Sequence, residues 1–302
     1  MPKLKHKLSI TSLFTTTLAA SLLLSSLFTS HLVSANNRVV SAGAGITELV
    51  LALDAGDELV GVDSTSQLPN TMASVAVLGY HRMLSAEGIL ALSPTLVLGS
   101  DAMGPQTTLT ILSSANVAVT TLPSAETKTQ LLANIEQMGQ LLNRNNQAIK
   151  LAAQIEQSFA RLEAKQQQVT AMGKVPKVLF LLLQQDRPAR VGGSNTAADI
   201  IIKLAGGQNI AGFDGYKSVS QEGILAMQPD MILISNRSNE QTQTAAKTLL
   251  TKMPLLHHTP AGENNHIKSL PPQALLGGLG LSAIEVAELL ANDFISLKTL
   301  AH

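Results

Sequence analysis

The only two tyrosines of this 302-residue chain, Tyr80 and Tyr216, each stand near the start of the same sequence motif. One copy covers residues 79–94 and the other covers residues 215–229. An ionised tyrosine oxygen can bind a hard metal cation, but a free phenol has a pKa of about 10, so the cation or a neighbour must favour ionisation. Arg82, two residues after Tyr80, could donate a hydrogen bond to such a phenolate, and the second copy has no arginine there. Alternatively, Tyr80 is a loop residue that packs its ring at the edge of its lobe and binds nothing.

A glutamate occupies the same place in each copy, at Glu87 and Glu222, two residues after a serine. Ser85 and Ser220 can each cap the N-terminus of a helix. A glutamate in the first turn then interacts favourably with the helix dipole, by about 0.3–1 kcal/mol. Helix capping is the interpretation that these residues support by themselves.

A wider duplication predicts that the two motifs belong to two similar lobes. Apolar residues at helical spacing in 46–53 return in 197–204, and the tripeptide 61–63 is matched by 212–214, in each case 151 positions later. Strand-like runs alternate with these helices, which predicts an α/β fold of two Rossmann-like lobes, with parallel sheets and a ligand cleft between them. The tyrosines are only 136 positions apart, so the first lobe carries about fifteen extra residues before Tyr80, and loops of that length are often functional.

The segment between the lobes predicts a long helix. Glycine appears between residues 128 and 172 only at Gly139, and apolar residues keep a helical stripe: Leu141, Ile149, Leu151, Ala152, Ile155, Phe159 and Leu162. A rigid helical crossing resists bending, whereas a loop hinge flexes. We therefore expect a signal peptide at 1–35, an N-terminal lobe at 36–143, a crossing helix at 144–172 and a C-terminal lobe at 173–302.

The N-terminus has the features of an export signal. Three lysines within the first seven residues precede an apolar stretch over about residues 8–28, and residues 33–35 supply small side chains for cleavage. Threonine and serine interrupt the apolar stretch, which disfavours a permanent membrane anchor. The chain has no cysteine, so neither disulfides nor a lipid anchor is expected. These features predict cleavage after Ala35 and a free periplasmic protein that is not a lipoprotein.

Composition argues against two other classes of protein. Without the three N-terminal lysines, 18 basic side chains face 21 acidic ones, and tryptophan is missing, so nucleic acid is not an expected partner. The chain lacks a cysteine nucleophile, a G-x-S-x-G elbow, an H-E-x-x-H pair and a P-loop, which argues against an enzyme. Gly43-Ala44-Gly45 precedes a helix, but Glu48 replaces the third glycine of the dinucleotide fingerprint, so we interpret the glycines as a tight turn.

Over essentially the whole mature chain, the sequence resembles the solute-binding proteins of ABC importers for iron complexes and cobalamin. Both copies of the motif carry the Glu-Gly-Ile-Leu-Ala-x-x-Pro core of that family. Within the family, Gly-Tyr-His-Arg-x-Leu-Ser-Ala-Glu-Gly at residues 79–88 is similar to the haem-binding receptors of bacterial haem uptake. Residues 196–199, 205–207 and 212–217 resemble the second lobe of the same receptors.

The resemblance implies that Tyr80 is the axial ligand of ferric haem, because a phenolate suits a hard ferric iron. It places Arg82, His81, Tyr216 and Lys217 in the haem cleft. His81 is not expected to bind the iron, because neighbouring side chains of an extended chain point to opposite sides. Some relatives supply a sixth ligand from a histidine after the first strand of the second lobe, but residues 184–188 contain none. This departure favours five-coordinate iron, or closure by water or glutamine. The family's aromatic-Gly-Pro-Arg ending is also altered here, to Gly-Leu-Gly-Leu at residues 278–281.

The resemblance also implies a partner. In the family, the glutamates that correspond to Glu87 and Glu222 contact arginines on the two subunits of an inner-membrane ABC permease. We expect this binding protein to be a monomer. A ferric-siderophore or cobalamin receptor of the same fold is the nearest alternative. A zinc or manganese receptor would need several histidine and acidic ligands at one point. A periplasmic enzyme on a two-lobed scaffold is the remaining alternative.

Overall fold

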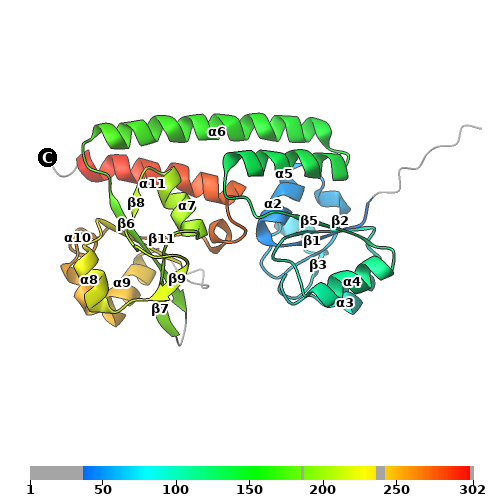
Figure 1. Cartoon of the computed structure of the whole chain (residues 1–302), viewed down its shortest axis with the longest axis horizontal. Helices are drawn as coiled ribbons and strands as arrows, with labels where there is room; N and C mark the ends of the chain where they lie inside the picture. Colours follow the sequence, from blue (N-terminus) through cyan, green and yellow to red (C-terminus); the bar gives the residue numbers. More distant parts are fainter. Residues whose placement is uncertain (1–36, 185–186, 236–241, 300–302) are drawn as a thin grey trace, which may run out of the picture. The chain divides into compact units, whose positions relative to one another are not determined.

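The computed structural model describes residues 37–184, 187–235 and 242–299, and Figure 1 shows how their helices and strands are arranged. The predicted signal peptide, residues 1–35, lies outside the described residues. In the described ranges no helix is both long enough and apolar enough to span a bilayer. The expected division of the chain at residues 143 and 172 stays a prediction.

The first lobe is built on a five-stranded sheet in the order β3-β2-β1-β4-β5, in which every pair of neighbours is parallel. Its strands are β1 (Val39–Ala42), β2 (Leu59–Val62), β3 (Ala76–Val77), β4 (Leu96–Ser100) and β5 (Ala118–Leu122). All four residues of β1 are buried, as expected for the central strand of a sheet with both faces covered. The parallel sheet predicted for this lobe is confirmed.

The helices of the first lobe follow from its apolar periodicity. They are α2 (Ala44–Ala52), α3 (Ala86–Leu90), α4 (Gln106–Ser114) and α5 (Lys128–Leu141), with short 3-10 turns η1 (Gly56–Glu58) and η2 (Asn70–Met72). The predicted face of α2 is buried at Ile46, Leu49 and Val50. The helix ends before Gly56, because Asp54 takes the left-handed conformation (φ 57°) that stops it.

A long helix, α6 (Asn145–Ala171), follows α5, and Figure 1 shows it running alongside α5 and α11. Its inner face buries Ala148, Leu151, Ile155, Leu162 and Val169, so the predicted crossing helix is confirmed. Ile149 does not belong to this stripe. Its side chain is 69% exposed, because residue 149 lies one position after Ala148 and therefore about 100° around the helix.

The second lobe contains a mixed sheet in the order β11-β10-β6-β7-β9, with β8 paired to β6. Its strands are β6 (Lys177–Gln184), β7 (Arg187–Gly192), β8 (Gln208–Asn209), β9 (Tyr216–Ser218), β10 (Met231–Ser235) and β11 (Ile267–Ser269). The expectation of a fully parallel sheet is wrong here, because β7 is antiparallel to both β6 and β9. Only two residues separate β6 from β7, and a parallel connection needs a crossover of a dozen residues or more.

Helices complete the second lobe and close the core. They are α7 (Ala197–Leu204), α8 (Gln221–Met227), α9 (Thr242–Lys252), α10 (Pro260–Glu263) and α11 (Leu281–Thr299), with 3-10 turns η3 (Pro254–His258) and η4 (Pro272–Leu275). The closing helix α11 contacts α6, α7 and α2. Phe294 of α11 is fully buried in a core cluster that contains residues of both lobes. The predicted class, two α/β lobes joined by a long helix, is confirmed.

Candidate functional site

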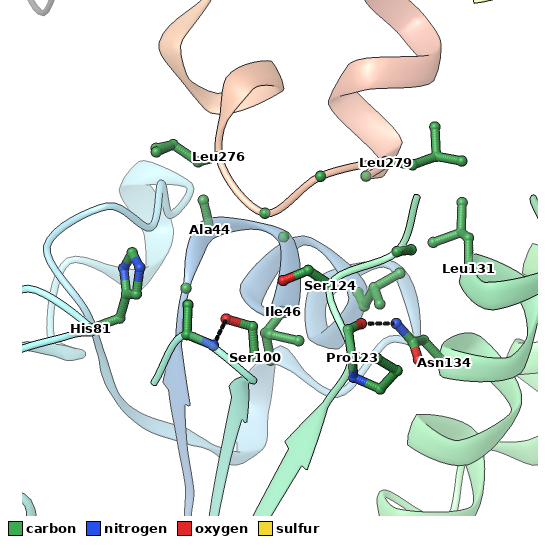
Figure 2. A pocket seen from close by; sticks show the side chains of 18 of the residues that line it. Ala44, Ile46, His81, Ser100, Pro123, Ser124, Leu131, Asn134, Leu276 and Leu279 are labelled. Atoms are coloured by element: carbon green, nitrogen blue, oxygen red, sulfur yellow. Dashed lines mark hydrogen bonds between the residues drawn. The ribbon is translucent and has the colours of Figure 1, made fainter. Parts of the chain in front are cut away.

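A cavity of about 220 Å³ lies at the carboxyl ends of β1, β4 and β5. The chain runs outward from β1 to β2 and β3, and then returns to β4 on the other side of β1. In open parallel sheets, ligands bind in the crevice at such a reversal of strand order. The second lobe supplies a further wall through residues 275–280, which face the first lobe across the cavity in Figure 2.

The turn between β1 and α2 forms one wall of this pocket. Gly43 has a φ of 114°, in the region that favours glycine, and this allows the chain to turn sharply from the strand into the helix. The carbonyl oxygen of Gly43 accepts hydrogen bonds from the amides of Ile46 and Thr47, both at 3.1 Å. The predicted tight turn is confirmed at Gly43.

Tyr80 lies at the pocket on an exposed loop. Its side chain is 42% exposed, and its hydroxyl has no hydrogen-bond partner in the part of the chain that the structure describes. The backbone of the loop is nevertheless fixed. The Met83 amide donates to the Tyr80 carbonyl at 2.7 Å, and the Gly104 amide donates to the His81 carbonyl at 2.9 Å. A loop with a fixed backbone therefore places Tyr80, with its unpaired hydroxyl, among the residues that line the pocket.

His81 also lines the pocket, but its side chain is buried. Its ring centroid lies 4.3 Å from that of Tyr80, with the planes inclined by 54°. The premise that neighbouring side chains diverge is wrong here, because the Tyr80–Met83 hydrogen bond makes a turn and the chain is not extended. The Nδ1 atom of His81 lies 3.1 Å from Oδ2 of Asp63, so this nitrogen is already engaged.

Asp63, at the end of β2, holds a fully buried carboxylate. Besides His81, its donors are the Gly43 amide at 2.9 Å, the Thr65 amide and hydroxyl at 3.1 and 2.7 Å, and the Ser66 hydroxyl at 2.7 Å. Burial acts to raise the pKa of Asp63, but the hydrogen bonds, led by that of His81, outweigh burial and lower the pKa well below its usual range. The carboxylate is therefore ionised at neutral pH.

Arg82 is exposed and lines the pocket beside Tyr80. Its guanidinium makes neither a hydrogen bond nor an ion pair with any described residue, so it is free to reach a ligand or the phenol. The predicted hydrogen bond from Arg82 to a Tyr80 phenolate stays a prediction.

Tyr216 and Lys217 are not among the residues that line this pocket. Tyr216 belongs to β9, and its partly buried ring lies 6.4 Å from that of Phe180, edge to face. Burial raises the pKa of Tyr216, although the charge of Arg190 and a hydrogen bond with Thr196 act in the opposite direction. The Lys217 ammonium lies 5.1 Å from the ring centroid of Phe213.

Glu87 and Glu222 occupy matching exposed positions in the first turns of α3 and α8. The predicted serine caps are confirmed, because Ser85 accepts from the Gly88 amide at 3.4 Å and Ser220 accepts from the Gly223 amide at 3.2 Å. The pKa of the Glu222 carboxyl is lowered, first by its own backbone amide and then by Ser220. Neither glutamate lines the pocket, and their predicted contact with a permease stays a prediction.

A cleft between the lobes was predicted, but the contacts that hold its wall from the second lobe were not. The Leu279 amide donates to the Ala125 carbonyl at 2.6 Å, and Gly278 bridges to Ala125 in parallel register. On α2, the Glu48 carboxylate accepts hydrogen bonds from the Ser282 hydroxyl and from the Ser282 amide at 3.2 Å. Burial raises the pKa of Glu48, and the bonds from Ser282 only partly offset it. These partners lie 234 positions apart, so no local pattern could reveal them.

Both apolar and polar side chains line the pocket. Ile46, Leu131 and Leu279 line it, while Tyr80 and Arg82 stand beside them with unpaired polar groups in the described chain. No group of three or more histidine, cysteine or acidic residues that could hold a metal ion occurs within residues 37–184, 187–235 and 242–299. This arrangement suits a largely apolar ligand that brings its own metal or charge.

The fold and the pocket together define a two-lobed ligand-binding protein. The sequence profile of the family described as "Periplasmic binding protein" matches residues 39–274, and the chain therefore belongs to that family. It is 42% identical to the periplasmic haem-binding protein HutB of Vibrio cholerae, with 85% of this chain and 98% of that chain covered and a TM-score of 0.78. It is 32% identical to a periplasmic haem-binding protein from Pseudomonas aeruginosa, with 86% and 93% covered and a TM-score of 0.80.

A curated relative carries a different ligand in its name. The chain is 26% identical over 250 residues to a vitamin B12-binding protein of Vibrio parahaemolyticus, which covers 81% of this chain and 86% of that protein. The predicted class is confirmed: this is a periplasmic binding protein of the iron-complex and cobalamin type. Members of the family are substrate-binding proteins of transport systems and not enzymes, and their place is the periplasm.

Proposed function

We propose that the chain binds ferric haem beside Tyr80 and delivers it to an inner-membrane ABC permease. The observation that carries the proposal is Tyr80, which lines a largely apolar pocket and whose hydroxyl has no hydrogen-bond partner in the described residues. Two similar proteins above 30% identity are named for haem binding, which supports this choice of ligand.

The chemistry of the pocket suits a ferric macrocycle. Ferric iron favours an anionic oxygen ligand and lowers the pKa of a bound phenol, and the free guanidinium of Arg82 would stabilise the phenolate further. The cavity of about 220 Å³ is smaller than the roughly 300–1,000 Å³ of common ligand sites, so a porphyrin would extend beyond it along the Tyr80 loop. Met83, 73% exposed on that loop, offers apolar surface there. We keep Tyr216 and Lys217 as cleft residues of the second lobe, with the exposed Lys217 ammonium as a candidate partner for a haem propionate.

Delivery would use the two acidic positions. Glu87 and Glu222 are exposed, one in each lobe, which suits a permease with two similar subunits and basic contact residues. We further propose that residues 1–35 are a cleaved signal peptide, that the mature chain carries no lipid anchor because it has no cysteine, and that it acts as a monomer.

A cobalamin receptor is the second candidate, because a similar curated protein is named for vitamin B12. The two are separated by titrating the purified mature protein with haemin, with cyanocobalamin and with a ferric hydroxamate siderophore, following absorbance. We expect saturable binding of haemin, with a Soret band and the charge-transfer absorption of a high-spin ferric phenolate. Tight binding of either other ligand, with haemin bound only weakly and without those bands, would overturn the proposal.

A further inference from the structure

The buried carboxylate of Asp63 connects the pocket wall to the Tyr80 loop. Its donors come from three segments: the β1–α2 turn at Gly43, the chain just after β2 at Thr65 and Ser66, and the Tyr80 loop at His81. The first and third of these segments line the pocket. One side chain therefore fixes the positions of two pocket walls relative to each other.

His81 transmits this constraint to Tyr80. Because ionised Asp63 can only accept hydrogen bonds, Nδ1 of His81 must be the protonated nitrogen, and this fixes the orientation of the imidazole. The Gly104 amide holds the His81 backbone at the same time, at 2.9 Å from its carbonyl oxygen. The Tyr80 ring rests against this imidazole with 4.3 Å between centroids, while its hydroxyl has no partner of its own in the described chain.

The second lobe shows that this arrangement is not required by the duplicated fold. Asp214 matches Asp63 in the repeat, but it is exposed and accepts a hydrogen bond from Asn195 at 2.7 Å. Lys217 stands where the first copy has His81, and its ammonium lies over Phe213. The Asp63–His81 pair therefore occurs only in the copy whose tyrosine faces the pocket.

We propose that Asp63 is a positioning residue for the iron ligand: through Nδ1 of His81 it fixes the imidazole against which the Tyr80 ring packs, and so aims the phenol oxygen into the pocket. This inference rests on the proposed role of Tyr80 in haem binding. Asp63 acts through His81 and does not itself bind haem.

The test compares Asp63→Asn and His81→Phe with Asp214→Asn, each titrated with haemin as the full mature chain. Asp63→Asn keeps the volume but removes one acceptor, while His81→Phe keeps a ring beside Tyr80 and removes the hydrogen bond to Asp63. Loss of a group that orients a metal ligand typically costs about 10- to 100-fold in affinity, and we expect a loss of that size in both variants. We also expect a shifted phenolate charge-transfer band, and a double variant no weaker than the worse single one. Asp214→Asn should match wild type.

The outcomes separate this inference from the proposed function. If wild type shows no phenolate band with haemin, the role of Tyr80 fails and this inference fails with it. If wild type shows the band, and His81→Phe binds haemin with unchanged affinity and spectrum, only the positioning role is overturned, whatever happens to thermal stability. Should Asp63→Asn not fold, His81→Phe still decides, because it leaves the four other donors of Asp63 in place.

Discussion

The two copies of the tyrosine motif fold alike where they are helical and differ where they precede the helix. In both, a serine caps a short helix, α3 or α8, with a glutamate in its first turn. Before the helix, Tyr80 stands on an exposed loop at the pocket, whereas Tyr216 is part of β9 in the sheet. A local motif thus determines its own helix and cap, but not the environment of the tyrosine that begins it.

Loop length and packing explain the difference. The first lobe has about fifteen more residues between Asp63 and Tyr80 than the second has between Asp214 and Tyr216, so Tyr80 can reach the pocket rim. In the second lobe the short connection leaves residue 216 in register with Gly192 of β7. A side chain at Gly192 would lie 3.2 Å from the Tyr216 ring, so the glycine makes room for this tyrosine to pack.

The largest effect should come from replacing each of the two tyrosines in turn by phenylalanine. Tyr80→Phe removes the proposed iron ligand. Its haem affinity should fall by more than the roughly 10- to 100-fold that is typical when a group that only orients a metal ligand is lost. Tyr216→Phe removes a hydroxyl that does not line the pocket and should lower affinity much less. Absorbance titration with haemin measures both. Equal losses in the two variants would show that both tyrosines serve the same site.

A smaller effect is expected from the arginine near each tyrosine. Arg82→Ala should reduce haem affinity by about one to two decades, because a hydrogen bond to a charged group contributes roughly 1.5–3 kcal/mol. Arg190→Ala is the matched control, since Arg190 lies over the Tyr216 ring and donates to the Tyr216 carbonyl at 2.6 Å. It should not change the haem spectrum. An unaltered spectrum and affinity in Arg82→Ala would mean that Arg82 does not contact the phenolate.

The matching glutamates test whether the two lobes also serve delivery to the permease. Glu87→Ala with Glu222→Ala should leave haem binding intact but reduce permease ATPase stimulation in vesicles several-fold, since each exposed pair contributes about 0.2–1 kcal/mol. Reversal to lysine should be more severe, because like charges would then meet. Replacement of Glu136 and Glu163, exposed on α5 and α6, is the control. Normal stimulation of the permease ATPase by the double alanine variant would contradict a docking role. Both glutamates would then only stabilise the N-termini of their helices.

The smallest effect concerns Glu48 and its counterpart in the repeat, Asp199. The pKa of Glu48 is raised by burial, so its contribution to stability is fully present below its unfolded pKa and is lost as pH rises through the folded pKa. Glu48→Gln should remove this loss, so the Tm of the variant relative to wild type should increase from about pH 4 to pH 7. Asp199→Asn is the matched variant in the second lobe, where the carboxylate pairs with Lys203 at 2.7 Å. A constant difference in Tm for Glu48→Gln would contradict the raised pKa.

The sequence alone determined the parts of this protein that depend on short-range periodicity. The apolar face of α2, the long helix α6 and the caps at Ser85 and Ser220 all follow from residues within a few positions of one another. Hydrogen bonds and side-chain contacts along a helix join residues three or four apart, so the pattern that forms them can be read directly. The family resemblance rested on motifs of the same short range.

The tertiary structure decided which of these residues meet. The antiparallel β7 and β9, the contact of Tyr80 with His81, and the pocket wall held by Ala125 and Glu48 were not evident from the sequence. Each depends on a turn or on partners far apart in the chain. Hydrophobic burial brings such partners together, but it is non-directional and sets no fixed separation between them in the sequence. The two tyrosines, alike in sequence, occupy different environments for this reason.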